Sequence, residues 1–227
     1  MGCPACEPVT GSNSRWEPAG PVIHENVPVI TQYASPGLIG PIAYAGHDPG
    51  DDPAWSTTGA ADHAEYITWC GHLCGMACLQ MILAHRDGRA PTLLDLLREG
   101  LPHGTYRPEA DGRIRGLFYA PFLTYVRAEH GLDGQVHPEL TPDDLRDHLL
   151  AGATMAMVSV HKEIRRPERP APGRGGHLVL VTGYRPATDT LVFHNPSGHT
   201  PGTRAAELPV PVFESFYARR GLTLTMT

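Results

Sequence analysis

Residues 74–83 read CGMACLQMIL, and apolar residues continue to recur as far as about Arg86. Apolar side chains fall on three sides of the helix that this stretch would form, whereas a surface helix carries a single apolar stripe. The sequence therefore predicts a helix that begins at Cys74 and is buried nearly all round. Such a helix lies at the centre of a domain, so we expect the other elements to pack around it.

The remaining pattern predicts helices first and strands afterwards. Helices are expected at 92–99, between Pro91 and Gly100, at 116–130, and at 141–150, where Thr-Pro-Asp-Asp supplies an N-cap, a first-turn proline and acidic residues. After Gly152, short β-branched or apolar segments bounded by Gly, Pro and Asp predict strands. These strands are 154–161, 177–184, 190–195 and 222–226, with an earlier short strand at 27–32 and a helix or strand at 212–217. This order is the α+β pattern, with an antiparallel sheet.

The length and composition predict a single folding unit. The chain has 227 residues, of which 41% are hydrophobic, enough for one fairly large core. Residues 1–22 read as a flexible N-terminal arm, and 23–227 as one domain. Within it, 33–69 is rich in glycine and proline, so we expect an insertion over one face without regular elements longer than a few residues. Residues 162–174 are basic and proline-rich and predict an exposed loop.

The charge pattern argues against several classes of partner. Eighteen Lys and Arg against 24 Asp and Glu give a formal net charge of −6, without long blocks of like charge. Neither nucleic acid nor an anionic membrane is therefore expected as a partner. The sequence predicts no signal peptide and no membrane span. Five cysteines leave at least one thiol outside any intramolecular disulfide, and we expect a cytoplasmic protein.

Cys74 is a candidate nucleophile because of its place in the predicted fold. A thiol at a helix N-terminus faces unpaired N–H groups and the positive end of the helix dipole, both of which lower its pKa. Alternatively, Cys74 only fills space in the core, since cysteine is among the most buried residue types.

Two residues far along the chain favour the chemical interpretation. His177 follows a glycine-rich GRGG segment and begins an otherwise apolar strand, where an imidazole is either hydrogen-bonded in the core or held for use. Asn195 lies eighteen residues later, at the end of the next predicted strand, so a hairpin can return it to the His177 ring. A thiol, an imidazole and a carboxamide are the parts of a cysteine nucleophile, its base and an orienting group.

At this point the chain resembles the papain-like cysteine peptidases, most closely the bacteriocin-processing, double-glycine type and its stand-alone relatives. The matching motifs are CGMACLQMIL, GGHLVLVTGY and LVFHNP, in the family's order and spacing. The resemblance implies a papain-like fold with Cys74 as nucleophile, His177 as general base and acid, and Asn195, where the family usually has Asp, as the orienting group. It also implies an oxyanion-hole glutamine before the nucleophile. That residue would be Gln32 in VPVITQY, displaced by the insertion at 33–69.

These roles predict acyl transfer through a thioester. Resolution of the thioester by water would make the protein a peptidase or amidase acting on a peptide or protein substrate, and resolution by another acceptor would make it an acyltransferase. His72, Gly75 and Gly176, which flank the two reactive residues, are expected to line the substrate cleft. We expect no cofactor and no metal.

Two other functions remain open on the sequence alone. Cys3-x2-Cys6 has metal-ligand spacing, and Cys70, His72, Cys74 and Cys78 cluster within nine residues, which is compatible with a zinc module. A binding protein that keeps the fold without its chemistry is the other alternative. The sequence makes no prediction of the oligomeric state.

Overall fold

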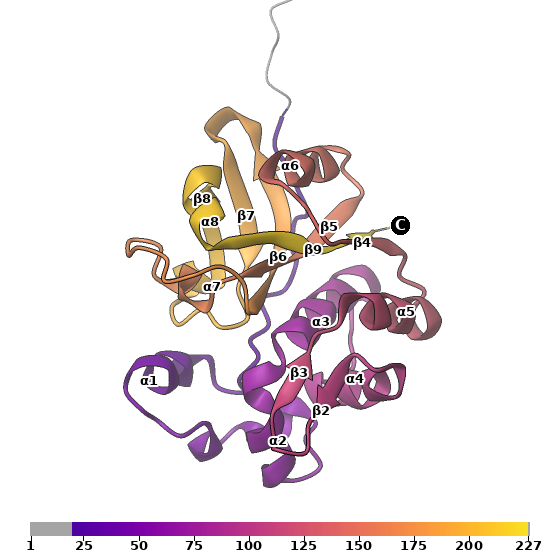
Figure 1. Cartoon of the computed structure of the whole chain (residues 1–227), viewed down its shortest axis with the longest axis vertical. Coiled ribbons are helices and arrows are strands. Elements are labelled where there is room, and N and C mark those ends of the chain that lie inside the picture. Colours follow the sequence, from indigo (N-terminus) through magenta and orange to yellow (C-terminus); the bar gives the residue numbers. More distant parts are fainter. Residues whose placement is uncertain (1–19, 227) are drawn as a thin grey trace, which may run out of the picture.

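The computed structural model describes residues 20–226 and has an α+β fold, as predicted (Figure 1). The helices are α1 (Ile39–Tyr44), α2 (His63–Trp69), α3 (Cys74–Asp87), α4 (Leu93–Gly100), α5 (Tyr119–His130), α6 (Pro142–Leu150), α7 (Pro201–Arg204) and α8 (Val210–Phe216). The strands are β1 (Val22–Ile23), β2 (Tyr106–Pro108), β3 (Ile114–Gly116), β4 (Gly134–His137), β5 (Thr154–Val160), β6 (His177–Arg185), β7 (Thr190–His194), β8 (Ala205–Pro209) and β9 (Tyr217–Thr225). The predicted arm at 1–22, with Cys3 and Cys6, lies outside the described residues up to position 19, and Val22 already belongs to β1.

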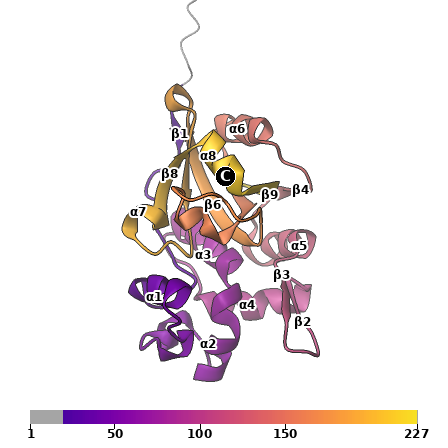
Figure 2. The same ribbon diagram turned by 60° about the vertical axis from the view of Figure 1, so that its left-hand side comes forward.

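The molecule has a helical side and a sheet side. In both views α1 to α5 lie together on one side, and the main sheet lies on the other with α6 and α8 (Figures 1 and 2). Side chains alternate along β6: Leu178 and Leu180 pack in the core that contains α3, and Val179 and Val181 pack in the core that contains α6 and α8. The sheet is therefore buried on both faces, which explains the continuous apolar run in β6.

The main sheet is antiparallel, in the order β4-β9-β5-β6-β7-β8, and β1 also pairs with β6. The strands predicted at 154–161, 177–184, 190–195 and 222–226 are confirmed as β5, β6, β7 and part of β9. The two outermost strands, β4 and β8, were not predicted. Their sequences, GQVH and AAELP, hold Gly, Ala, Glu and Pro, which are depleted in strands, so pairing with a neighbour decides their structure.

The central helix α3 is confirmed over Cys74–Asp87. Its residues Gly75 to Leu79 and Met81 to Leu83 are buried, and it contacts both β6 and α4. The helix ends at Gly88, whose φ of 73° is the left-handed conformation that glycine adopts readily.

The other predicted helices are confirmed with one altered boundary. The Thr92 side chain caps α4 by accepting from the Asp95 N–H, and Thr141 with Asp144 forms a capping box on α6. The helix predicted from Gly116 begins at Tyr119 instead, because Gly116 pairs with Tyr106 in the β2–β3 hairpin. Residues 210–216 form the helix α8.

The strand predicted at 27–32 is wrong, and so is the expectation that the insertion at 33–69 has no regular element longer than a few residues. Pro28 has no N–H for a sheet, and the Gln32 N–H donates to the Pro196 carbonyl rather than to a strand. The insertion holds α1 and α2, which are six and seven residues long.

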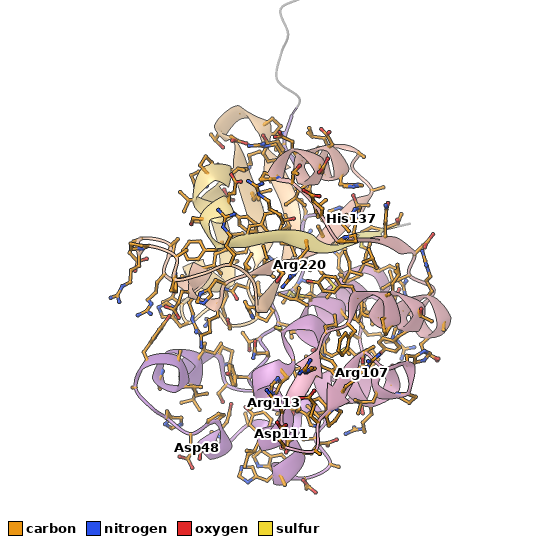
Figure 3. The ribbon with its side chains drawn as sticks, in the orientation of Figure 1. Asp48, Arg107, Asp111, Arg113, His137 and Arg220 are labelled. Atoms are coloured by element: carbon orange, nitrogen blue, oxygen red, sulfur yellow. The ribbon has the colours of Figure 1, made fainter. Side chains whose placement is uncertain are left out.

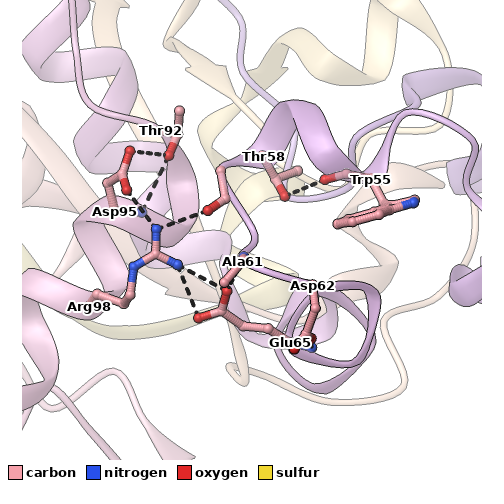
Figure 4. Close-up of polar contacts among 9 residues, drawn as sticks. Trp55, Thr58, Ala61, Asp62, Glu65, Thr92, Asp95 and Arg98 are labelled. Atoms are coloured by element: carbon pink, nitrogen blue, oxygen red, sulfur yellow. Dashed lines mark hydrogen bonds and ion pairs between the residues drawn. The ribbon is translucent and has the colours of Figure 1, made fainter.

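The insertion is tied to α4 and to itself by polar contacts. Arg98 in α4 bonds the Glu65 carboxylate in α2, at 2.9 Å, and the Gly59 carbonyl, also at 2.9 Å (Figure 4). The buried Asp52 accepts from the Ser35 hydroxyl at 2.6 Å and from the Tyr66 hydroxyl at 3.0 Å. These contacts fix the segment that carries α1 against the helical side.

The loop predicted to be exposed at 162–174 is exposed only in part. Its first turn, Lys162–Arg165, is a 3-10 helix in which Ile164 and Arg165 are buried. Ile164 packs in the core that contains α8, and the Arg165 guanidinium lies over the Tyr44 ring of α1, 5.1 Å from its centroid.

Among the described residues, no single helix is long and apolar enough to cross a membrane. His63–His72 and Cys74–Asp87 meet the criteria of length and hydropathy only together, as a pair bent by 89°.

Candidate active site

Cys74 is the first residue of α3 and lies where the helical side meets the sheet. It is partly exposed, in contrast to the buried residues that follow it, and it lines two cavities. The Gln32 cavity has a volume of about 260 Å³ and is lined by Gln32, Tyr33, Ile39, Ile42, Ala43, Gly71, Cys74, Lys162, Arg165, Gly176, His177 and Ser197. The Tyr119 cavity has a volume of about 470 Å³ and is lined by Cys74, Gly116, Leu117, Phe118, Tyr119, Ser159, Gly176, His177, Leu178 and Arg220. Cys74, Gly176 and His177 are common to both, so the two cavities meet at the thiol and the imidazole.

His177 is the first residue of β6 and pairs with Val160 of β5. Its side chain is only 6% exposed. The chain enters the strand through Gly175 and Gly176, whose φ angles of +81° and +92° suit glycine and strain other residues. The glycine-rich segment before His177 thus sets the position from which the ring reaches the cavity wall.

Asn195 follows the last residue of β7 and is completely buried. Its Oδ1 accepts from His177 Nε2 at 2.8 Å and from the Ser197 backbone N–H at 3.0 Å. Because the backbone N–H can only donate, the side-chain atom that faces it is the oxygen, and His177 Nε2 carries a hydrogen. The other ring nitrogen, Nδ1, is then the basic one.

Ser197 was not predicted as a site residue. Its hydroxyl lies 3.1 Å from His177 Nε2 and 3.3 Å from Asn195 Oδ1, so it forms the third member of a buried polar cluster. The Asn-Pro-Ser sequence after an apolar strand could have indicated this position, because a turn at the proline places the serine beside the asparagine.

Gln32 lines the cavity that also contains Cys74 and His177. Its Nε2 donates to the Cys70 carbonyl at 2.9 Å, and its backbone N–H donates to the Pro196 carbonyl at 3.0 Å. A primary amide carries two hydrogens, so the bond to Cys70 occupies one and leaves a second. Gln32 is therefore held from both sides, by the segment before Cys74 and by the turn that contains Asn195.

Burial dominates the electrostatics of the two reactive groups: although Cys74 as a residue is partly exposed, its thiol is surrounded by protein atoms. Burial raises the pKa of the Cys74 thiol above its usual value, although backbone hydrogen bonds from Leu178 and Gly75 act in the other direction. It lowers the pKa of His177 to about 4, against a smaller opposite effect of the Asn195 bond. The prediction that the helix N-terminus gives Cys74 a lowered pKa is thus wrong, and at neutral pH both groups are uncharged without substrate.

Three residues were expected to line the cleft. Gly176 lines both cavities, whereas His72 and Gly75 line neither. His72 is exposed to solvent, and its carbonyl accepts from the Tyr106 hydroxyl at 3.0 Å. Gly75 is buried in α3, where an added Cβ would lie 3.0 Å from the Leu117 side chain.

Several lining residues were not singled out in the sequence. Ile39, Ile42 and Ala43 come from α1, so the insertion at 33–69 supplies part of the wall of the Gln32 cavity. Arg220 in β9 lines the Tyr119 cavity, and Figure 3 shows it where the sheet faces the helical side.

The cysteine and histidine cluster that suggested zinc does not converge in the described part of the chain. Cys70, Cys74 and Cys78 are all free thiols, and no group of three or more His, Cys, Asp or Glu side chains within residues 20–226 is arranged to hold a metal ion.

A prediction for stability follows from the burial of His177. In the unfolded chain its pKa returns to about 6.5, so between pH 6.5 and 4 the unfolded state binds more protons and the free energy of unfolding falls as the pH falls. The loss attributable to this ring is about 3 kcal/mol over that range. Urea unfolding of the wild type and of His177→Ala at pH 7 and pH 4.5 should show a smaller pH dependence in the variant. Equal pH dependence in both proteins would contradict the burial of a neutral imidazole.

No protein-family model matches the sequence, and the search of curated proteins also gave no match.

Proposed function

We propose that this protein is a cysteine peptidase or amidase of the papain-like type. One observation carries the proposal: His177 Nε2 is bonded at 2.8 Å to Asn195 Oδ1, and the ring lines the same two cavities as Cys74. A helix-borne thiol, an imidazole on an opposing sheet and an amide that orients the imidazole together constitute a nucleophile, a base and an orienting group. The α+β fold and the resemblance of the sequence motifs support the same interpretation.

In the first step, the Cys74 sulfur attacks a substrate carbonyl. Because both groups start uncharged, His177 Nδ1 takes the thiol proton as the sulfur–carbon bond forms. The imidazolium produced is held in place by Asn195 Oδ1, which accepts from Nε2–H. Asn195 carries no charge, so it orients the ring without the added stabilisation that a carboxylate would give.

The negative charge on the substrate oxygen requires donors that already point at it. The Cys74 N–H begins α3 and has no partner within the helix, and Gln32 Nε2 keeps one hydrogen beyond its bond to Cys70. The tetrahedral intermediate collapses when His177 gives its proton to the leaving amine. Water then attacks the thioester, with His177 again as base, and releases the acid.

The role of Gln32 is tested by replacement with alanine. Loss of one oxyanion donor is expected to lower kcat by about 10²- to 10³-fold with a much smaller change in KM. Gln80→Ala is the matched control, because Gln80 Nε2 also donates to a carbonyl, that of Pro91 at 2.7 Å, but lines neither cavity. Equal kcat in Gln32→Ala and Gln80→Ala would remove Gln32 from the mechanism.

The function itself is tested with a mixture of peptides from a digested proteome. Incubation with the wild type should produce new termini that are absent after incubation with Cys74→Ala, as read by mass spectrometry. Adding glycinamide distinguishes the outcomes of the thioester: hydrolysis leaves free carboxyl termini, and transfer attaches glycinamide to them. If neither product appears with the wild type, the protein is not a peptidase or an acyltransferase of peptides, and a binding function is favoured.

A further inference from the structure

The Gln32 cavity has a positively charged wall. Lys162 and Arg165 line it, and none of its lining residues is an Asp or Glu. Both cations come from the 3-10 turn that links β5 to the loop before His177. Lys162 is exposed, whereas Arg165 is only 6% exposed.

The contacts of Arg165 leave its charge poorly compensated. Its nearest acid is Glu163, at 3.4 Å from Nη2, and that carboxylate is shared with Arg166, whose Nε donates to it at 2.8 Å. Arg165 Nε is buried and has no hydrogen-bond partner among the described residues. A buried guanidinium N–H without an acceptor is costly, and an anion that supplies that acceptor is bound with a charge-assisted gain.

The same charges act on the reactive groups. Lys162 and Arg165 both contribute to the lowered pKa of His177, so the positive field extends to the imidazole. Proton transfer from Cys74 adds a third positive charge to those of Lys162 and Arg165, on the His177 ring. An anion in the cavity would offset the field and favour that charge.

We propose that the Gln32 cavity binds a carboxylate of the substrate next to the reacting carbonyl, with Arg165 as the main ligand and Lys162 as a second. The anion site names the substrate class of the proposed hydrolase. The turnover measurements below rest on that proposed function, whereas the alkylation measurements do not. The carboxylate belongs either to an acidic side chain or to a peptide C-terminus within a residue or two of the cleaved bond.

The charge preference is measured first without any turnover, by alkylation. Iodoacetate and iodoacetamide differ in carrying a carboxylate or an amide, and each transfers its carboxymethyl or carbamoylmethyl group to the thiolate, forming a sulfur–CH2 bond as iodide leaves. Equimolar reagents are mixed with the protein at pH 8.5, and the two Cys74 products are quantified by mass mapping, with N-acetylcysteine as the reference thiol. In the wild type we expect the iodoacetate-to-iodoacetamide ratio to exceed that of N-acetylcysteine by about tenfold or more.

Variants assign the preference to the cavity. Arg165→Gln should return the ratio to within about threefold of the reference, and Lys162→Gln should lower it less. Arg166→Gln is the matched control, because Arg166 is in the same loop and shares Glu163 but does not line the cavity. If Arg165→Gln does not fold, the ratio in the wild type and its decrease in Lys162→Gln still test whether the cavity binds the anion.

Four results would overturn the proposal. The first three are a wild-type ratio equal to the reference, an elevated ratio that survives Arg165→Gln, and a ratio that falls only in Arg220→Gln, which would assign the anion to the Tyr119 cavity. Failure of both reagents to label Cys74 would also overturn it, because the cavity would not open onto the thiol.

Peptides then identify the source of the carboxylate. For a peptide that the wild type cleaves, Glu is exchanged for Gln at each position beside the cleaved bond, and a C-terminal acid is exchanged for an amide. One exchange should lower kcat/KM by about tenfold to 100-fold, and that loss should disappear in Arg165→Gln. A raised alkylation ratio without cleavage of any peptide would refute the hydrolase and leave the anion site standing, whereas cleavage without a charge preference would do the reverse.

Discussion

Replacing Cys74 with alanine is expected to lower kcat for any peptide that the protein cleaves by about 10⁴- to 10⁶-fold. The thioester cannot form without the sulfur, and the loss of a nucleophile costs nearly as much as the loss of the whole catalytic group. The fold should remain, because Cys74 is partly exposed at the first position of α3 and its side chain does not cap the helix. Unfolding in urea should shift by no more than about 1 kcal/mol.

The matched control is Cys78→Ala, one turn further along the same helix. Cys78 is completely buried and contacts the Leu178 carbonyl only weakly, at 3.9 Å, and it lines neither cavity. Its replacement should cost stability through the lost packing and leave kcat within about threefold of the wild type. Turnover that survives in Cys74→Ala, or that is lost equally in Cys78→Ala, would show that the chemistry lies elsewhere.

The second large effect is expected for His177→Ala, with a loss of about 10³- to 10⁵-fold in kcat. Because burial raises the pKa of the Cys74 thiol, the sulfur depends on the imidazole to take its proton during the attack. The rate of Cys74 alkylation at neutral pH should fall as well. Added imidazole should restore part of the activity, because the space left by the side chain opens onto both cavities.

His194→Ala is the control for the histidine. His194 is also a sheet residue, in β7, and burial also lowers its pKa, but it lines neither cavity. Its replacement should leave kcat nearly unchanged. Equal losses in the two variants would mean that His177 acts only through the stability of the sheet.

Helix α3 and strands β5 to β7 could be predicted because their local pattern and their environment agree. Each of these elements is buried on more than one side, and burial on several sides produces the nearly continuous apolar sequence from which they were predicted. The outer strands β4 and β8 could not be predicted, since their composition is poor for strands and pairing with β9 and β7 supplies the hydrogen bonds.

Residues of the site were predictable to differing degrees. Cys74, His177 and Asn195 stand at the ends of strongly patterned elements, which made their proximity a reasonable expectation. Gln32 was reached only through the resemblance, because it is held by Cys70 and Pro196, both distant in the sequence.

Two properties of the site depended on burial that local sequence does not reveal. Arg165 lies in a stretch that reads as an exposed basic loop, but it is buried, with its guanidinium over the Tyr44 ring of α1 and in contact with Glu163. The pKa of Cys74 was predicted with the wrong sign for a related reason. The helix N-terminus is where it was expected, but desolvation outweighs its effect.

The most direct test of the central claim is to trap the acyl group on the enzyme. The wild type is mixed with N-acetylglycine p-nitrophenyl ester, quenched in acid during turnover and digested for mass mapping. The proposed mechanism predicts an N-acetylglycyl group on Cys74 that hydroxylamine removes and that forms far more slowly in His177→Ala. Acylation of Cys70 or Cys78 in its place, or turnover with no acyl group on any thiol, would contradict the mechanism.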